Sequence, residues 1–152
     1  MRTVLLLIDL INHSFCHDES TNLKKKQNTL TKNVNALIDI ARSKDWPIIW
    51  VREQYKADLS DMPRWRKEKL KKKGKEAKVP TEGSCEAEFL AELHRRPAED
   101  ETVVKKNYSA FFGTDLCEIL KKSQKKNRVS GSLSEESIPR HVFTQRPWMP
   151  SN

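Results

Sequence analysis

The fold is decided by the stretch Thr3-Val-Leu-Leu-Leu-Ile-Asp9, in which five consecutive apolar residues end at a carboxylate. A strand with one face in water alternates apolar and polar side chains, whereas a continuous apolar run is typical of a strand that is buried on both faces. Parallel sheets covered by helices bury their strands in this way. We therefore expect residues 3–9 to form a strand of a parallel sheet.

Two further apolar runs predict strands at residues 47–51 and 102–105. The first contains Ile48-Ile-Trp-Val51 and the second Thr102-Val-Val-Lys105. Between the first two strands the sequence is polar and loop-like over residues 11–28, and one helix face then follows, formed by Leu30, Val34, Leu37, Ile38 and Ala41. Strand, helix and strand in this order indicate parallel βαβ units, so the expected fold class is α/β with a doubly wound parallel sheet.

Two later helices are predicted from their start signals. Ser84 is a plausible N-cap for a helix whose apolar contacts are Phe89, Leu90 and Leu93. Thr114 caps the next helix, whose inward-facing residues are Leu116, Ile119 and Leu120. Residues 53–82 are polar and basic, which indicates a long loop with some helix.

The net charge of +8 is concentrated in one segment. Residues 64–78 contain nine Lys or Arg and two Glu, which gives +7 and leaves about +1 for the rest. The bland interpretation is a solvated helix or loop, and we favour it. The alternative is a non-catalytic protein that binds nucleic acid or another anionic partner with this segment, where Trp65 could stack on a base.

The cysteine pattern indicates a reduced, cytoplasmic protein. Cys16, Cys85 and Cys117 are odd in number and widely spaced, without a CxxC pair. The apolar run at the start is too short for a signal peptide, and no run approaches the roughly 20 residues of a membrane span. We expect neither a membrane partner nor a membrane location.

Two motifs carry a resemblance to a known family. Val4-Leu-Leu-Leu-Ile-Asp-Leu-Ile-Asn12 resembles the first strand of isochorismatase-like cysteine hydrolases, which ends in a catalytic Asp. Val103-Val-Lys-Lys-Asn-Tyr-Ser-Ala-Phe-Phe-Gly-Thr-Asp-Leu116 resembles the family's strand ending in a catalytic Lys, followed by Tyr-Ser-Ala-Phe and a Gly-Thr-Asp-Leu helix start. Glu82-Gly-Ser84 is a third, weaker match. The resemblance covers about residues 1–120.

The resemblance implies a catalytic pair formed by Asp9 and Lys105. The family's Lys stands three residues before the Tyr, which selects Lys105 and not Lys106. In the family a Cys thiol attacks an amide-type carbonyl, the Asp takes the thiol proton and the Lys stabilises the charged species. The implied substrate is a small molecule with an amide-type C–N or vinyl-ether bond, and many relatives form oligomers. Without the resemblance, Asp9 is a strand-end cap and Lys105 a solvated lysine.

The sequence departs from the family's binding motifs. Ile11-Asn-His-Ser14 replaces a typical Gln-Asn-Asp-Phe and retains only Asn12. The Asp-x-His motif of metal-binding nicotinamidases is missing from Val51-Arg-Glu-Gln-Tyr55, and His13, His17, His94 and His141 are scattered, so we expect no metal and no cofactor.

The nucleophile motif is missing as well. The family has Gly-Val-x-Thr-x-x-Cys-Val after the fourth strand, and no such stretch follows Leu120. Cys117 lies within the helix-start motif and is interpreted as a small packing residue. Cys16, in the loop after the first strand, and Cys85, at a helix start, have no counterpart among the family's nucleophiles.

The tail, read in a shifted frame, supplies the missing motif. In this frame, the third base of each codon is read together with the first two bases of the next codon. The codons of Trp148-Met-Pro150 can then encode only Asp-Ala. The codons of residues 135–150 allow the sequence Gly-Val-Asn-Thr-x-Ala-Cys-Val-His-Thr-Thr-Ala-Leu-Asp-Ala. A net one-base loss in the lysine codons of residues 121–126 would explain this, and the rival is a genuine, unrelated C-terminus.

These observations predict two parts. Residues 1–120 form a partial hydrolase domain, and residues 121–152 form a non-homologous tail, disordered beyond about residue 125. Without a fourth strand, the first strand of an incomplete sheet keeps an apolar edge that favours association into a homo-oligomer.

Overall fold

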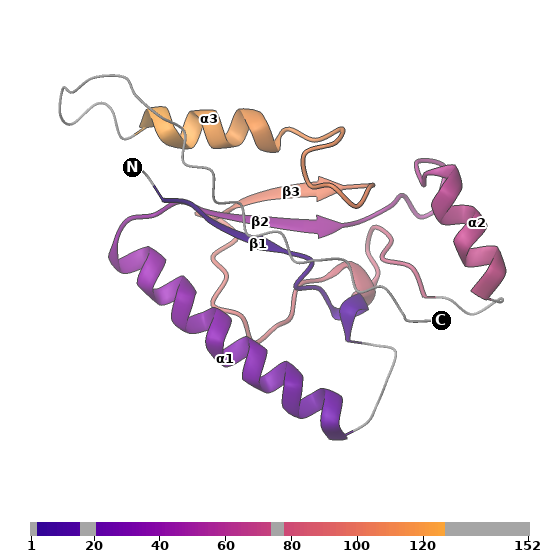
Figure 1. Ribbon diagram of the computed structural model, residues 1–152, viewed down its shortest axis with the longest axis horizontal. Coiled ribbons are helices and arrows are strands. Elements are labelled where there is room, and N and C mark those ends of the chain that lie inside the picture. The colour runs from indigo at the N-terminus through magenta and orange to yellow at the C-terminus, as the bar shows by residue number, and fades with distance from the viewer. Residues whose placement is uncertain (1–2, 16–20, 74–77, 127–152) are drawn as a thin grey trace.

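The computed structural model describes residues 3–15, 21–73 and 78–126 and contains a three-stranded parallel sheet between two helices (Figure 1). The strands are β1 (Leu5–Ile8), β2 (Ile48–Glu53) and β3 (Glu101–Lys105), in the order β1-β2-β3. Leu5 pairs with Ile48, and Ile49 pairs with Glu101. Because all strands run in one direction, their carboxyl ends meet at the same end of the sheet. The predicted α/β fold and all three predicted strands are confirmed.

The helices lie on both faces and beyond one end of the sheet. Helix α1 (Thr21–Ser43) covers one face and α3 (Leu116–Lys126) the other (Figure 1). Helix α2 (Arg64–Lys73) lies beyond the carboxyl ends of the strands. The 3-10 turns η1 (Asn12–Ser14) and η2 (Cys85–Ala87) lie between these elements.

Strands β1 and β2 distribute their apolar side chains between two cores. Of the run in β1, Leu5 and Leu7 pack into the cluster beneath α1, whereas Leu6 and Ile8 pack into the cluster beneath α3. Trp50 in the central strand is fully buried in the α1 cluster and meets Phe89 edge to face, with ring centroids 5.2 Å apart. This two-sided burial explains why the apolar runs do not alternate with polar residues.

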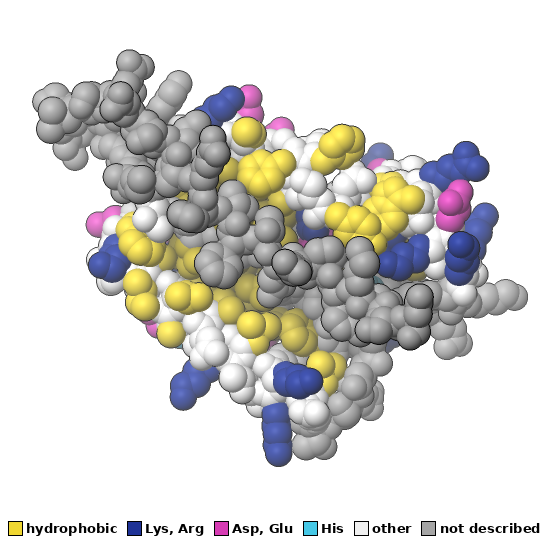
Figure 2. Space-filling model, viewed as in Figure 1, with side chains coloured by type: hydrophobic (Ala, Val, Ile, Leu, Met, Phe, Trp, Pro, Cys, Tyr) yellow, Lys and Arg dark blue, Asp and Glu magenta, His cyan; other side chains and the backbone are white. Residues whose placement is uncertain are grey.

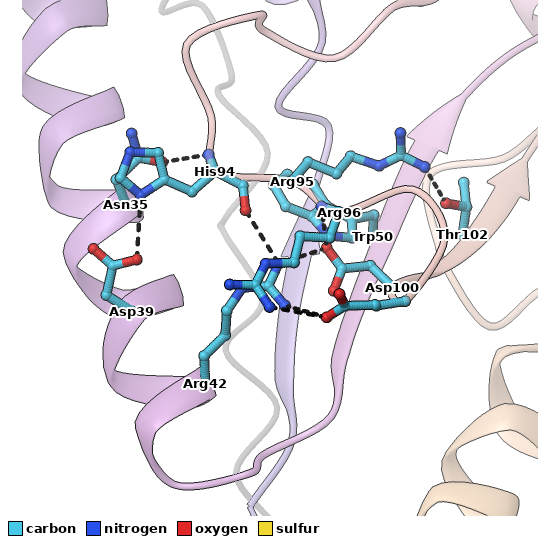
Figure 3. Close-up of polar contacts among 10 residues, drawn as sticks. Asn35, Asp39, Arg42, Trp50, His94, Arg95, Arg96, Asp100 and Thr102 are labelled. Carbon is cyan, nitrogen blue, oxygen red and sulfur yellow. Dashed lines mark hydrogen bonds and ion pairs between the residues drawn. The ribbon is translucent and has the colours of Figure 1, made fainter.

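Helix α1 has a polar flank, which consists of Asn35, Asp39 and Arg42. The segment 92–100 packs against this flank (Figure 3). Asn35 donates to the carbonyl of Glu92 at 2.8 Å and accepts from the amide of His94 at 2.9 Å. These contacts fix the segment that leads into β3 against the helix.

Asp100, directly before β3, is the centre of the contacts at the amino-terminal end of that strand (Figure 3). Its side chain is only 3% exposed. It accepts from Arg42 Nη2 at 3.0 Å, from Trp50 Nε1 at 3.0 Å and from the amide of Arg96 at 2.8 Å. A buried carboxylate is stable only when it is paired in this way, so these contacts join α1, β2 and the start of β3.

The opposite side of α1, its apolar flank, consists of Leu30, Leu37 and Ile40. Leu37 is 51% exposed and Ile40 is 46% exposed, so Leu37 does not share the buried face of Val34, Ile38 and Ala41 as predicted. The prediction of a loop over residues 11–28 is also wrong in part, because α1 begins at Thr21.

The prediction of a helix after Ser84 is wrong. Only the short turn η2 forms, although Phe89, Leu90 and Leu93 are buried as expected. The reason is that the backbone of this segment pairs with the residues that follow β1: the amide of Leu90 donates to the carbonyl of Leu10 at 3.1 Å. This segment therefore extends alongside residues 10–12.

The last helix follows its predicted start. The hydroxyl of Thr114 accepts from the amide of Leu116 at 3.4 Å, and Leu116 is fully buried. Helix α3 continues past Leu120 to Lys126, beyond the predicted domain boundary. The tail of residues 127–152, for which disorder was predicted, lies outside the described residues. Within the described ranges, no helix is long and apolar enough to cross a bilayer.

Candidate active site

Asp9 and Lys105, predicted from separate motifs, meet at the carboxyl ends of two strands. Asp9 directly follows β1, and Lys105 is the last residue of β3. Lys105 Nζ lies 2.7 Å from Asp9 Oδ2. The lysine side chain is only 6% exposed, whereas that of Asp9 is 37% exposed. The ion pair is therefore closed on the lysine side and open to solvent on the carboxylate side.

The backbone at Asp9 turns sharply as it leaves the strand. Its φ is +57°, in the left-handed region that few residues other than glycine adopt, although Asp is among the more tolerant. Ser14 Oγ donates to the Asp9 carbonyl at 2.9 Å, and the amide of Asp9 donates to the carbonyl of Val51 at 2.9 Å. These bonds hold the turn that directs the carboxylate toward β3.

The central strand contributes Glu53, which the sequence analysis missed. Its amide donates to Asp9 Oδ1 at 3.2 Å, so both oxygens of Asp9 have partners. Its own carboxylate lies 3.3 Å from Arg66 Nη2 of α2 and accepts from the hydroxyl of Tyr55. Glu53 ends β2 as Asp9 follows β1, so the strand-end position was a signal that could have identified it.

Tyr55 is fully buried beside this carboxylate. Burial of the phenol and its hydrogen bond to Glu53 raise the pKa of Tyr55 above its usual range. Tyr55 therefore stays protonated and donates to Glu53 at neutral pH. Through Glu53, the contacts of Arg66 and Tyr55 extend to the amide that holds Asp9.

The neighbouring lysines point to different partners. Lys106 Nζ lies 2.7 Å from Asp61 Oδ2, whereas Lys105 reaches Asp9 and also donates to the carbonyl of Tyr108 at 3.2 Å. The ring of Tyr108 stacks on Trp65 of α2, with centroids 4.5 Å apart. Trp65, half-buried in this stack, is thus already engaged by a protein side chain.

The cysteines do not complete this group in the described residues. Asn12 Nδ2 donates to the carbonyl of Cys85 at 2.9 Å and lies 3.4 Å from its Sγ, and this thiol is exposed at the start of η2. Cys117 is exposed on α3, so its interpretation as a packing residue is wrong. Cys16 lies outside the described residues.

Two of the four histidines, His13 in η1 and His94, are among the described residues. His94 contacts Asp39 of α1 at 3.2 Å, and His17 and His141 lie outside the described residues. Within the described ranges, no group of three or more His, Cys, Asp or Glu side chains is placed to hold a metal ion. The chemistry that this arrangement can perform is proton acceptance by an exposed carboxylate whose charge a buried ammonium balances.

The chain is similar to known proteins over most of its length. The family model described as the isochorismatase domain matches residues 3–129. A protein from Arabidopsis thaliana named a probable inactive nicotinamidase is 28% identical over 142 residues, which cover 93% of this chain and 71% of the relative.

Solved structures show the same fold. An N-carbamoylsarcosine amidase from Thermoplasma acidophilum has a TM-score of 0.59 at 22% identity, covering 82% of this chain and 63% of that structure. A cysteine hydrolase from Pseudomonas syringae has a TM-score of 0.65 at 23% identity, covering 80% and 55%. The chain thus spans less than two thirds of the length of these two structures.

Proposed function

The chain belongs to the isochorismatase family, and from this premise we propose that it is a cysteine-hydrolase scaffold that retains Asp9 and Lys105 but does not turn over substrate as a chain of 152 residues. The proposed reaction class is hydrolysis of an amide-type C–N bond or a vinyl ether in a small molecule. The observation that carries the proposal is the 2.7 Å contact between Lys105 Nζ and Asp9 Oδ2 at the carboxyl ends of β3 and β1.

The proposed roles follow from burial and charge. Asp9 accepts the proton of an attacking thiol, because its carboxylate is the exposed member of the pair. Lys105, which is paired with Asp9, stabilises negative charge that develops during attack. Glu53 is a positioning residue, since its amide fixes the second oxygen of Asp9. Proton transfer alone does not break the bond, and a thiolate is needed as nucleophile.

The proposed reason for inactivity is that no Cys motif of the family follows Leu120. Of residues 121–152, those beyond the family match, which ends at residue 129, are proposed to be a non-homologous tail produced by a one-base frameshift. Sequencing the gene from the codons of Leu116 to well past that of Asn152 tests this directly. An open shifted frame that spells the Cys segment supports the proposal, and an early stop in that frame contradicts it.

The functional test compares the chain as it is with a version whose reading frame is restored. We expect no ammonia release from nicotinamide or N-carbamoylsarcosine by the 152-residue chain. The restored chain should hydrolyse at least one small amide, and Asp9→Ala or Lys105→Met should each lower its kcat by about 100-fold or more, as for loss of a general acid–base group. Activity of the 152-residue chain that disappears in Asp9→Ala would refute the inactivity.

We keep a non-catalytic binding role of α2 as the alternative. It is supported by the exposure of Arg64, Lys67, Lys69, Lys71 and Lys72. Since Trp65 already stacks on Tyr108, the free feature is positive charge, which favours contacts with phosphates over contacts with bases. A flat titration with an oligonucleotide at low salt would remove this alternative.

A further inference from the structure

The outer edge of β1 has no neighbouring strand in the described part of the chain. On its inner side, the amides of Leu5 and Asp9 donate to the carbonyls of Pro47 and Val51, both at 2.9 Å. Because alternate residues of a parallel strand bond to the same neighbour, the amides of Leu6 and Ile8 face away from β2. The outer edge therefore offers main-chain donors and acceptors for another strand.

The surroundings of this edge are apolar on both faces of the sheet. Val4, Leu5, Leu6 and Ile8 are each only partly buried. Beside them, the apolar flank of α1 exposes Leu37 and Ile40, about half a turn around the helix from the polar flank. Figure 2, viewed toward the β1 edge, shows apolar side chains gathered between α1 and α3.

The edge also lacks the features by which proteins prevent strand pairing. Residues 3–8 contain no charged side chain and no proline. Lysines, prolines and bulges at edge strands normally block such association. An apolar edge without them favours pairing with another apolar strand.

The chain offers one such strand, which is β1 itself in a second copy. The run Val4–Ile8 is the longest apolar run of the sequence, and the run Ile48–Val51 is the central strand, paired on both sides. Residues 127–152 contain three prolines and no comparable run. The occupant that fits the edge is therefore an identical edge.

We propose that two copies of this chain associate through β1, which pairs with β1 of the second copy in antiparallel orientation about a twofold axis. The two three-stranded sheets then form one continuous sheet. With the axis perpendicular to the sheet, both α1 helices lie on the same face, so the apolar flanks of α1 meet. Parallel pairing would set α1 beside α3 of the second copy instead, so the two apolar flanks would not meet.

The first test measures the oligomeric state of the full 152-residue chain by sedimentation velocity over a range of concentrations. We expect a monomer–dimer equilibrium. Leu37→Glu and Ile40→Glu should each weaken it by about ten-fold or more, because the charges of both copies come together at the axis. Lys32→Glu is the matched control, since it introduces the same side chain at an exposed position on the other side of α1, and it should leave the equilibrium unchanged.

The second test follows amide hydrogen exchange at Leu6 and Ile8. Exchange should slow at concentrations where the dimer forms and become fast on dilution, and Leu37→Glu should restore fast exchange at the higher concentration. A monomer at all concentrations overturns the proposal, as does a dimer that both glutamate variants leave intact. Protection of Leu6 and Ile8 that does not depend on concentration also overturns it, because a segment of the same chain then covers the edge.

Discussion

The two ends of the sheet each hold a carboxylate in an ion pair, and the two carboxylates differ in exposure. Asp100, before β3, is 3% exposed and has three donors around it. Asp9, after β1, is 37% exposed, although its partner Lys105 is buried. At the amino-terminal end the carboxylate is enclosed and joins elements together. At the carboxyl-terminal end it remains accessible, which is what a reacting group requires.

The largest effect is expected at the enclosed end. Asp100→Ala leaves Arg42, whose side chain is 18% exposed, without its closest charged partner and leaves the indole N–H of Trp50 without its acceptor. We expect a loss of about 3–5 kcal/mol in the free energy of unfolding, measured by urea denaturation. Glu99→Ala is the control, because Glu99 is 60% exposed and its contacts with Arg42 and Arg96 should contribute less than about 1 kcal/mol. Equal losses in both variants would contradict the structural role of Asp100.

At the carboxyl-terminal end of the sheet, removing Asp9 and removing Lys105 should lower the free energy of unfolding by different amounts. Asp9→Ala leaves a buried ammonium unpaired, so we expect a loss of about 2–3 kcal/mol. Lys105→Met leaves the Asp9 carboxylate, which water can reach and which still accepts from the amide of Glu53. We therefore expect a loss of about 1 kcal/mol or less in the free energy of unfolding. Urea denaturation of both variants and of the double variant measures the difference. The reverse order would mean that Asp9 is enclosed as Asp100 is.

The smallest change in stability is expected at Tyr55, whose hydroxyl donates to Glu53. Tyr55→Phe removes the hydrogen bond to Glu53 and should cost about 1 kcal/mol at pH 7. The pKa of Tyr55 is raised in the folded chain, so the stability due to its protonated form is complete below pH 10 and is lost as the pH rises above about 10. The difference between parent and variant should therefore shrink in urea denaturation at about pH 10.5. A difference independent of pH would show that the hydroxyl is not protected.

The sequence predicted the sheet well because each strand is a local apolar run. The resemblance to the family selected Lys105 over Lys106, and the structure pairs these lysines with Asp9 and Asp61 respectively. The catalytic role of the Asp9–Lys105 pair stays a prediction. The role of Glu53 could not be read from the sequence alone, because it depends on a backbone amide whose position only the folded sheet defines.

The helix predicted after Ser84 failed for a tertiary reason. The spacing of Phe89, Leu90 and Leu93 suits a helix face, and all three residues are indeed buried. However, bonds from the amides of Asn12 and Leu90 to the carbonyls of Glu88 and Leu10 hold the segment beside residues 10–12. Pairing between distant parts of the chain overrides the local preference, and a periodic pattern contains no information about it.

The order of the strands in the sheet is also the order in which the ribosome releases them. Strand β2 can pair with β1 as soon as the residues up to Glu53 have left the exit tunnel, and β3 then adds on the far side of β2. No strand has to insert between two that are already placed. The outer edge of β1 is consequently left free by every later step up to Lys105, so it is open to association for as long as the sheet is being synthesised.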